Sequence, residues 1–350
     1  MAHTLERQKN QVKGTLFEVI VNRLLLKADY APIKADDIHI RSSDGHVRGR
    51  GYWHDIDALG RFAYPLFYMY PIRLLAEVKC YDKDVPLWAV RNFVGALKDI
   101  SENYFVEDKI SREQMLSYQR YTDCGSFFSA SGFTIGAQKF ALAQGVFLIS
   151  YENNPILRKI IDTMFGLIDF LDVQEASKRK ADFRKWISES LDHQFQSVNL
   201  GIFVPIQMQT DFVNQFNKLQ KDMDSVQTSA IAMIIGEEPA VQYPVHILSY
   251  QRIPETVFTG TDEHLFKVYF TETPRGLFFE VVPTEAEETR LLFSLPKHIY
   301  ARYFSEGRML EFKMAFINNI ELPATIHGIR RILRLKLDRE WVRRQQEGRS

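Results

Sequence analysis

The segment Leu74-Leu-Ala-Glu-Val-Lys-Cys80 has the pattern of a buried β-strand that ends in charged residues. Because successive side chains of a strand point to opposite faces, Glu77 and Lys79 are predicted to share one face while Val78 packs in the core. Upstream, residues 54–59, which include Asp55-Ile-Asp57-Ala-Leu59, have the pattern of a preceding strand that carries acids. The two segments predict neighbouring strands whose acids and lysine meet at one site.

Two acids and a lysine in this layout are suited to the hydrolysis of a phosphodiester bond. The reaction needs a divalent metal ion that orients water and neutralises charge on the phosphate, and Mg²⁺ takes one or two carboxylates from a protein. A nearby lysine can hold the attacking water or stabilise the transition state. The alternative is a surface salt bridge between Glu77 and Lys79, which is worth little. The Glu-x-Lys pattern alone is weak, since it recurs at 107–109 and 311–313.

The context of this segment predicts a mixed α/β domain over residues 1–155, with a central mixed sheet flanked by helices. Apolar residues at helical spacing predict helices over 14–27 and 85–100, a strand followed by a helix over 127–143, and a strand over 146–151. Residues 156–235 have helical periodicity and dense charge, which predicts a helical connector.

Residues 236–350 are expected to form a β-rich C-terminal domain. We expect strands at 246–251, 265–271, 277–282, 291–295 and 309–317, followed by a last strand and a helix in the basic tail. This region carries no recognisable motif. Its role in target recognition, sensing or assembly is an expectation from architecture alone.

Bulk composition sets few limits. The 44 basic and 44 acidic residues balance, which does not exclude nucleic acid because a binding footprint is local. Two cysteines without metal-site spacing indicate a reducing compartment. The polar first residues and the lack of an apolar run of membrane-spanning length lead us to expect a soluble, cytoplasmic protein with no membrane partner.

Five blocks in order give the sequence a family resemblance. They are 14–18 (Gly-Thr-Leu-Phe-Glu), 49–57 (Gly-Arg-Gly-Tyr-Trp-His-Asp-Ile-Asp), 77–79 (Glu-Val-Lys), 90–96 (Val-Arg-Asn-Phe-Val-Gly-Ala) and 129–134 (Ser-Ala-Ser-Gly-Phe-Thr), the last followed by Ala137, Ala141 and the strand at 146–149. Over about residues 13–152 the chain resembles the Mrr-type, type IV restriction-endonuclease-like branch of the PD-(D/E)XK nucleases. The resemblance implies a restriction-endonuclease-like fold in this region.

The resemblance also implies roles for single residues. Asp57 and Glu77 match the metal-binding acids, and the backbone carbonyl of Val78 matches a third ligand. Lys79 matches the lysine that positions or activates water, and Glu18 matches an acid that assists metal binding. In a strand, Asp55 and Asp57 would lie on the same face because they are two residues apart, so Asp55 is the alternative to Asp57 as the metal-binding acid. Members of this branch often carry glutamine in place of Glu77, and glutamate there is the commoner form in the wider superfamily.

The function that the resemblance implies is Mg²⁺-dependent cleavage of DNA, with Mn²⁺ as a substitute, in restriction or antiviral defence. Cleavage of both strands requires two sites, so a homodimer or higher homo-oligomer is expected, with a defence-system protein as a possible partner. The resemblance places DNA backbone contacts at Arg91 and Lys98, although polar residues are required on that helix face anyway. Arg48 and Arg50 can reach a phosphate from their loop, and a solvated loop explains them equally. The basic tail can bind a phosphate backbone or contact an acidic face of the protein.

Other functions stay open. Within the same fold, the chain can be a structure-specific or repair nuclease, or one that acts on RNA. An inactive or partner-gated scaffold whose C-terminal domain senses a signal is the rival from another class.

Overall fold

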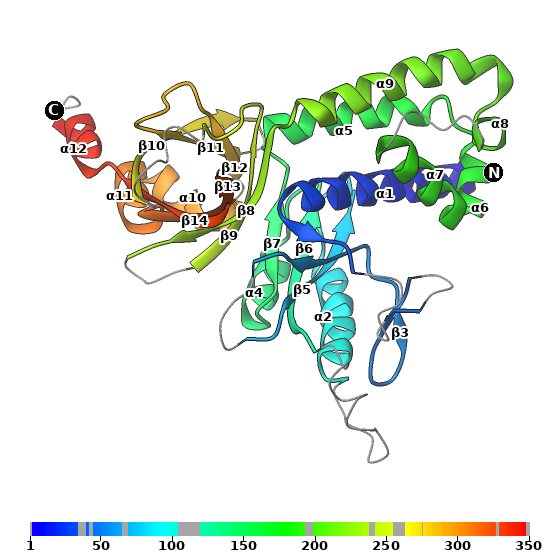
Figure 1. Ribbon diagram of the computed structural model, residues 1–350, viewed down its shortest axis with the longest axis horizontal. Helices are drawn as coiled ribbons and strands as arrows, with labels where there is room; N and C mark the ends of the chain where they lie inside the picture. The colour runs from blue at the N-terminus through cyan, green and yellow to red at the C-terminus, as the bar shows by residue number, and fades with distance from the viewer. Residues whose placement is uncertain are drawn as a thin grey trace.

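The computed structural model describes residues 2–33, 40–41, 45–64, 69–103, 120–192, 199–237, 242–254, 263–274, 276–326 and 329–347. Within these residues the chain forms a mixed α/β unit, a layer of helices packed on it, and a strand-rich unit (Figure 1). The two chain ends lie at opposite ends of the long axis.

A five-stranded mixed sheet is the centre of the first unit. Its strands, in spatial order, are β1 (Tyr30–Ala31), β4 (Ala58–Phe62), β5 (Ile72–Lys79), β6 (Thr122–Ser129) and β7 (Phe147–Ser150). β1, β4 and β5 pair antiparallel, whereas β5, β6 and β7 pair parallel. The carboxyl ends of the three parallel strands therefore lie at one edge of the sheet, and Lys79 is the last residue of β5.

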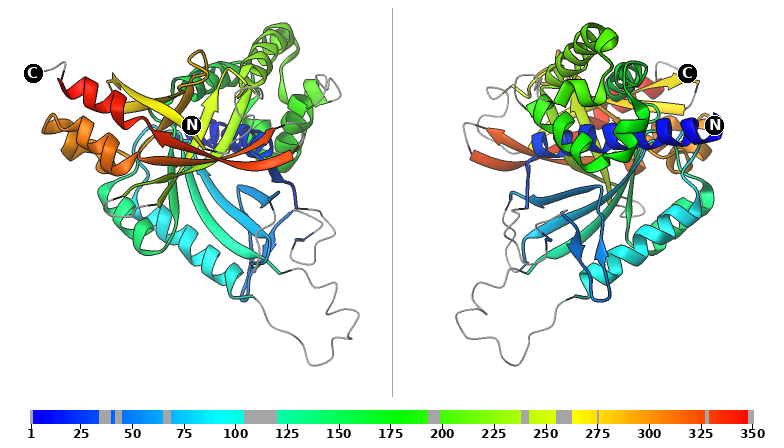
Figure 2. Two further views of the ribbon diagram at one scale, coloured as in Figure 1. Left: turned by 60° about the vertical axis from the view of Figure 1, so that its left-hand side comes forward. Right: turned by 90° about the vertical axis from the view of Figure 1, so that its right-hand side faces the viewer.

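Helices cover both faces of this sheet. The long helix α1 (Ala2–Lys27) packs on one face, where Leu74, Ala76 and Val78 of β5 join its core. The helices α2 (Leu87–Ser101) and α4 (Ile135–Ala143) pack on the other face against Leu75 of β5. Figure 2 shows the sheet between α1 and α2. The predicted mixed sheet flanked by helices is confirmed.

The region predicted as a helical connector forms a layer on α1. It consists of α5 (Pro155–Ile168), α6 (Val173–Lys178), α7 (Lys180–Asp192), α8 (Leu200–Phe203), a 3₁₀ turn (Ile206–Met208) and α9 (Gln209–Ser225). Trp186 of α7 is 1% exposed and stacks on Phe203 and Phe212. These helices and α1 share one apolar core, so the layer is fixed to the α/β unit.

The strand-rich unit is a closed seven-stranded barrel in the order β10-β11-β12-β9-β8-β13-β14. The strands are β8 (Thr228–Ile235), β9 (Gln242–Ser249), β10 (Glu263–Thr273), β11 (Gly276–Pro283), β12 (Leu291–Ser294), β13 (Asn319–Ile326) and β14 (Ile329–Leu337). The parallel pairing of β10 with β14 closes the barrel, while the other pairs are antiparallel. The expected domain boundary at 236 falls between β8 and β9, so the barrel begins earlier, at Thr228.

Helices accompany the barrel. They are α10 (Lys297–Ser305), α11 (Met309–Phe316) and α12 (Arg339–Glu347). Tyr300 of α10 and Phe312 of α11 contact Phe279 of the barrel core. The final strand and helix predicted in the tail are confirmed as β14 and α12.

Two strand predictions were wrong. Residues 309–317 form α11 because Met309, Phe312 and Phe316 follow helical spacing; a short apolar run does not distinguish strand from helix by itself. Glu311 and Lys313 therefore lie on a helix, and the pattern at 107–109 lies outside the described residues. The expected strand at 54–59 is divided into β3 (Trp53–His54), which pairs with β2 (Val47–Arg48), and β4, which begins at Ala58.

A buried hydrogen-bond chain joins the barrel to the α/β unit. Ser229 of β8 donates to the Leu24 carbonyl of α1 at 2.8 Å, so its oxygen must accept from Nε2 of His246, also 2.8 Å away. Nδ1 of His246 then accepts from the Tyr151 hydroxyl at 2.6 Å. Burial lowers the pKa of His246 to about 3, which keeps the ring neutral.

No helix in the described part of the chain is long and apolar enough to cross a membrane.

Candidate active site

Asp57 occupies the point where β4 and β5 separate. The ladder pairs Ala58 with Ala76, and Asp57 is the residue just before it. Its Oδ2 atom accepts a hydrogen bond from the backbone amide of Val78 at 2.9 Å. The side chain thus satisfies a β5 donor beyond the last ladder pair, and the carboxylate is only 8% exposed.

Lys79 connects the two strand acids. Its Nζ atom lies 3.0 Å from Oδ2 of Asp57 and forms an ion pair with Oε1 of Glu77. The contact between Lys79 and Glu77 is the shared face that strand alternation predicts, and Val78 between them is buried in the core. The surface salt bridge weighed as an alternative does not describe this pair, since both side chains are three-quarters or more buried and Asp57 joins them.

The electrostatics of these groups follow from burial and proximity. Burial raises the pKa of Glu77 to about 7, and the negative charge of Asp57 adds to the rise. Burial alone would lower the pKa of Lys79, but the carboxylates of Asp57 and Glu77 outweigh it and raise that pKa. Lys79 is therefore an ammonium ion that donates hydrogen bonds.

Glu18 brings a third carboxylate from α1. It is 5% exposed, and burial followed by the charge of Asp57 raises its pKa. Two cations of α7 hold it: Nζ of Lys180 lies 3.5 Å from Oε1, and Arg184 forms an ion pair with Oε2. Arg184 also lies 3.9 Å from Asp55.

The three acids and three cations define what we call the carboxylate cluster: Glu18, Asp57, Glu77, Lys79, Lys180 and Arg184. The acids are close enough to oppose one another's ionisation, and the cations offset that repulsion. Buried charges of this kind are costly unless they are paired.

A pocket of about 620 Å³ opens beside the carboxylate cluster. Glu18, Val78, Lys79 and Lys180 line one part of it. The rest is lined by α1 and the loop after β5, namely Asn10, Gln11, Gly14, Cys80, Tyr81, Asp82, Lys83, Asp84 and Pro86. A substrate in this pocket has direct access to two of the three cations and to Glu18.

The donor set fits a hard divalent cation by its chemistry. Among the described residues, no three His, Cys, Asp or Glu side chains are grouped as ligands of one metal ion. Mg²⁺ needs fewer, since it usually takes one or two carboxylates and keeps several waters. Asp57 and Glu77 with the Val78 carbonyl supply oxygens of that kind, and repulsion from Asp57 adds to the rise that burial causes in the pKa of Glu77. A divalent cation relieves this repulsion.

The structure separates Asp55 from Asp57. Asp57 is buried and contacts both Val78 and Lys79, whereas the Asp55 side chain is 52% exposed and lies nearest Arg184. The two side chains do not share a strand face, because Asp55 lies in the irregular segment between β3 and β4. Asp57 is the member of the carboxylate cluster.

Three of the four residues predicted as nucleic-acid contacts, Arg48, Arg50 and Lys98, lie toward the end of α2 that is far from this cluster. Arg50 pairs with Glu102 just after the end of α2, and Arg48 lies on the same β2–β3 hairpin. α2 starts near the pocket and spans 15 residues, about 22 Å, so its far end is remote from Lys79. Arg91 and Lys98 are exposed on α2, and Arg91 lies over the ring of Phe140. The structure does not bring Arg48, Arg50 or Lys98 to the cluster.

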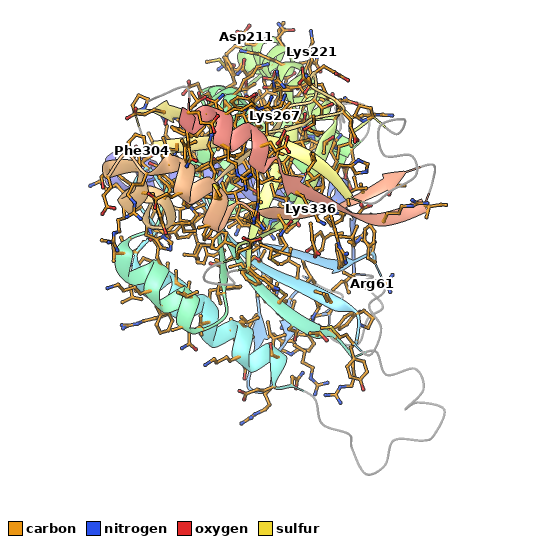
Figure 3. The ribbon with its side chains drawn as sticks, turned by 90° about the vertical axis from the view of Figure 1, so that its left-hand side faces the viewer. Arg61, Asp211, Lys221, Lys267, Phe304 and Lys336 are labelled. Atoms are coloured by element: carbon orange, nitrogen blue, oxygen red, sulfur yellow. The ribbon has the colours of Figure 1, made fainter. Side chains whose placement is uncertain are left out.

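The basic tail forms part of the barrel surface. Arg334 and Lys336 alternate with buried leucines on β14 and point outward. Figure 3 shows Lys336 beside the strand of Lys267 on this side of the barrel. Arg334 lies 3.5 Å from Glu321, and Arg339 pairs with Glu237. These pairs favour the contact with acidic groups over a phosphate-binding role for those two arginines.

Sequence reasoning missed Lys180 and Arg184. Their spacing of four places them on one face of α7, which was a usable signal. Nothing local indicated that this face meets Glu18 of α1, more than 160 positions earlier.

Comparison with known proteins gives no relative: no family model, no curated protein and no solved structure matches the chain.

Proposed function

We propose that this protein is a Mg²⁺-dependent endonuclease with a restriction-endonuclease-like fold, similar to the Mrr-type PD-(D/E)XK nucleases. The supporting observation is the convergence of Asp57, Glu77 and Lys79 at the end of β5, with Glu18 joining from α1. The mixed sheet flanked by helices is in line with the fold that the resemblance implies, and Asp57 and Glu77 are the positions that match its metal-binding acids.

Four residues of the cluster, Asp57, Glu77, Glu18 and Lys79, have proposed tasks in hydrolysis. Asp57, Glu77 and the Val78 carbonyl would hold Mg²⁺, and Glu18 would assist from the pocket side. Bound Mg²⁺ supplies Lewis acidity and lowers the pKa of a coordinated water. Lys79, as an ammonium ion, donates a hydrogen bond that orients the water for in-line attack. The water oxygen forms a bond to phosphorus and releases a proton to solvent, the bond from phosphorus to the leaving oxygen breaks, and that oxygen takes up a proton from solvent.

DNA is the proposed substrate, and defence against foreign DNA is the proposed setting. Cleavage of both strands requires two copies of the site, so we propose a homodimer or a higher homo-oligomer. A structure-specific, repair or RNA nuclease is the alternative within the same fold. Cleavage assays on DNA duplexes, RNA duplexes, single strands and flaps distinguish these activities.

The test is cleavage of supercoiled plasmid by the full-length protein with Mg²⁺, Mn²⁺ or EDTA. Glu77→Ala and Lys79→Ala remove two members of the cluster, and Glu311→Ala is the matched control because it alters a second Glu-x-Lys copy at an exposed position on α11. We expect metal-dependent nicking by the wild type and by Glu311→Ala, and loss of it in the other two variants. Circular dichroism of each variant checks that it is folded.

Two results would contradict parts of the proposal. Cutting that persists in both Glu77→Ala and Lys79→Ala would reject the site. If folded wild-type protein cuts neither DNA nor RNA duplexes, single strands or flaps, the enzyme proposal fails and the gated-scaffold alternative takes its place.

A further inference from the structure

The helical layer contributes two cations to the carboxylate cluster. Lys180 and Arg184 are one turn apart on α7, so both side chains leave the helix on the same face. That face is turned to α1, where the two cations contact the two oxygens of Glu18. The α/β unit that carries the acids therefore contains only one of the three cations, Lys79.

The position of α7 is fixed by packing that has no part in the cluster. Phe183, Trp186, Ile187 and Leu191 are each 1% exposed or less. The Trp186 ring stacks between Phe203 and Phe212 of the same layer. Arg184 is thus presented by a rigid helix.

Arg184 retains hydrogen-bonding capacity at this position. One terminal nitrogen pairs with Glu18, and the other lies 3.9 Å from Asp55, beyond hydrogen-bond distance. The Nε atom is buried, and none of the described residues accepts a hydrogen bond from it. The side chain is still 31% exposed, and Lys180 lines the pocket at 35% exposure.

We infer that Arg184, assisted by Lys180, binds a phosphate group of the nucleic-acid substrate in the pocket beside Lys79. This inference rests on the proposed function and names its substrate-binding residues. A guanidinium offers a planar set of donors that matches phosphate oxygens, and a lysine adds a point charge. Glu18 holds both cations in place in the free protein.

The balance of charges in the cluster favours a transfer of Lys180 and Arg184 from Glu18 to a substrate phosphate. The free cluster has three acids against three cations, so an added phosphodiester anion would have no unpaired cation to meet. Once a divalent cation neutralises the carboxylates, Glu18 no longer requires Lys180 and Arg184. Lys180, which lines the pocket, and Arg184, one turn away on the same face of α7, can then offer positive charge to an anion.

The test measures binding separately from cleavage. A short fluorescein-labelled DNA duplex is titrated with full-length protein by fluorescence anisotropy, with Ca²⁺ in place of Mg²⁺ to suppress hydrolysis. The variants are Arg184→Gln and Arg184→Lys. The matched control is Lys185→Ala, the next residue of α7, whose side chain is 76% exposed and pairs with Glu189 on the same helix.

We expect Arg184→Gln to weaken duplex binding by roughly tenfold to a hundredfold, the effect of one charged hydrogen-bonding group. Arg184→Lys should recover part of the binding, and Lys185→Ala should leave it unchanged. Mn²⁺ binding to Arg184→Gln, measured by calorimetry, should be unchanged or tighter, because the variant removes a cation that competes for Glu18. In the cleavage assay KM should rise more than kcat falls.

The outcomes distinguish this inference from the proposed function. If the wild type cuts DNA and Arg184→Gln binds the duplex as tightly, the inference is wrong and the enzyme stands. Faster cleavage by Arg184→Gln would show that Arg184 blocks the site, which also overturns the inference. Weaker Mn²⁺ binding without weaker duplex binding would assign Arg184 to the shaping of Glu18 alone. Failure of the wild type to cut any substrate rejects the proposed function itself.

Discussion

The carboxylate of Asp57 accepts a hydrogen bond from the backbone amide of Val78 at 2.9 Å, where the β4–β5 ladder ends. The same oxygen lies 3.0 Å from Nζ of Lys79. One side chain therefore caps a strand and orients the lysine of the candidate site, so its structural and chemical roles can be separated by mutation.

Asp57→Asn should abolish metal-dependent cleavage with little loss of stability. An asparagine oxygen can still accept from Val78, whereas the negative charge is lost. Asp57→Ala also removes the acceptor, and the buried amide left without a partner should cost about 1–3 kcal/mol of unfolding free energy. Urea denaturation with the plasmid assay measures both effects.

Asp55→Asn is the control for the two Asp57 variants. Its side chain is half exposed and outside the carboxylate cluster, so cleavage should continue. Loss of cleavage in Asp55→Asn but not in Asp57→Asn would reverse the assignment.

His246 should make the protein acid-sensitive. Its pKa is about 3 in the folded chain because of burial, against about 6.5 when unfolded, so the unfolded state binds more protons between these values. Stability falls as the pH drops below about 6.5, by at most about 1.4 kcal/mol per pH unit and roughly 5 kcal/mol in total.

The comparison that isolates this effect is wild type against His246→Gln. Glutamine does not titrate, and it can donate to Ser229 and accept from Tyr151. Urea midpoints measured from about pH 7 to about pH 4 should fall less steeply in the variant. Equal slopes would remove His246 as the source.

Asp123→Ala should destabilise the sheet strongly. Arg73 and Asp123 face each other across β5 and β6, both 2% exposed or less, with hydrogen bonds of 2.6 and 2.9 Å. Loss of the acid leaves the buried guanidinium without the carboxylate that neutralises its charge, at a cost of about 3–5 kcal/mol. The double variant Arg73→Met/Asp123→Leu should be more stable than Asp123→Ala in urea. If the double variant loses as much unfolding free energy as Arg73→Met and Asp123→Leu lose together, the two residues do not stabilise the fold as a pair.

Gly125→Ala should destabilise the packing of α2 on β6 by about 1–3 kcal/mol. An added Cβ would lie 2.4 Å from Cδ2 of Leu97 and 3.4 Å from atoms of Phe93 and Val146, all in the core. Gly95→Ala, on α2 itself, meets no atom within 4 Å and should stabilise by up to about 1 kcal/mol through helix propensity. Thermal melts of the two variants should therefore shift in opposite directions.

Local pattern predicted much of the α/β unit. The helical spacing of 14–27 and 85–100 and the apolar runs around 74–80 and 146–151 correspond to α1, α2, β5 and β7, because periodicity is a property of neighbouring residues. Pattern failed where the signal was short: residues 309–317 form a helix, and β8 was assigned to the connector.

The sequence by itself determined that Glu77 and Lys79 share a face, since alternation along a strand needs no other part of the chain. Tertiary structure alone decided three things. It placed Asp57 and not Asp55 against Val78, because β4 starts at Ala58. It closed the barrel through the parallel pairing of β10 with β14, which joins segments about 70 residues apart. It brought Lys180 and Arg184 to Glu18, because α7 is positioned by the packing of Trp186 and its neighbours, and no local pattern specifies which surface a packed helix meets.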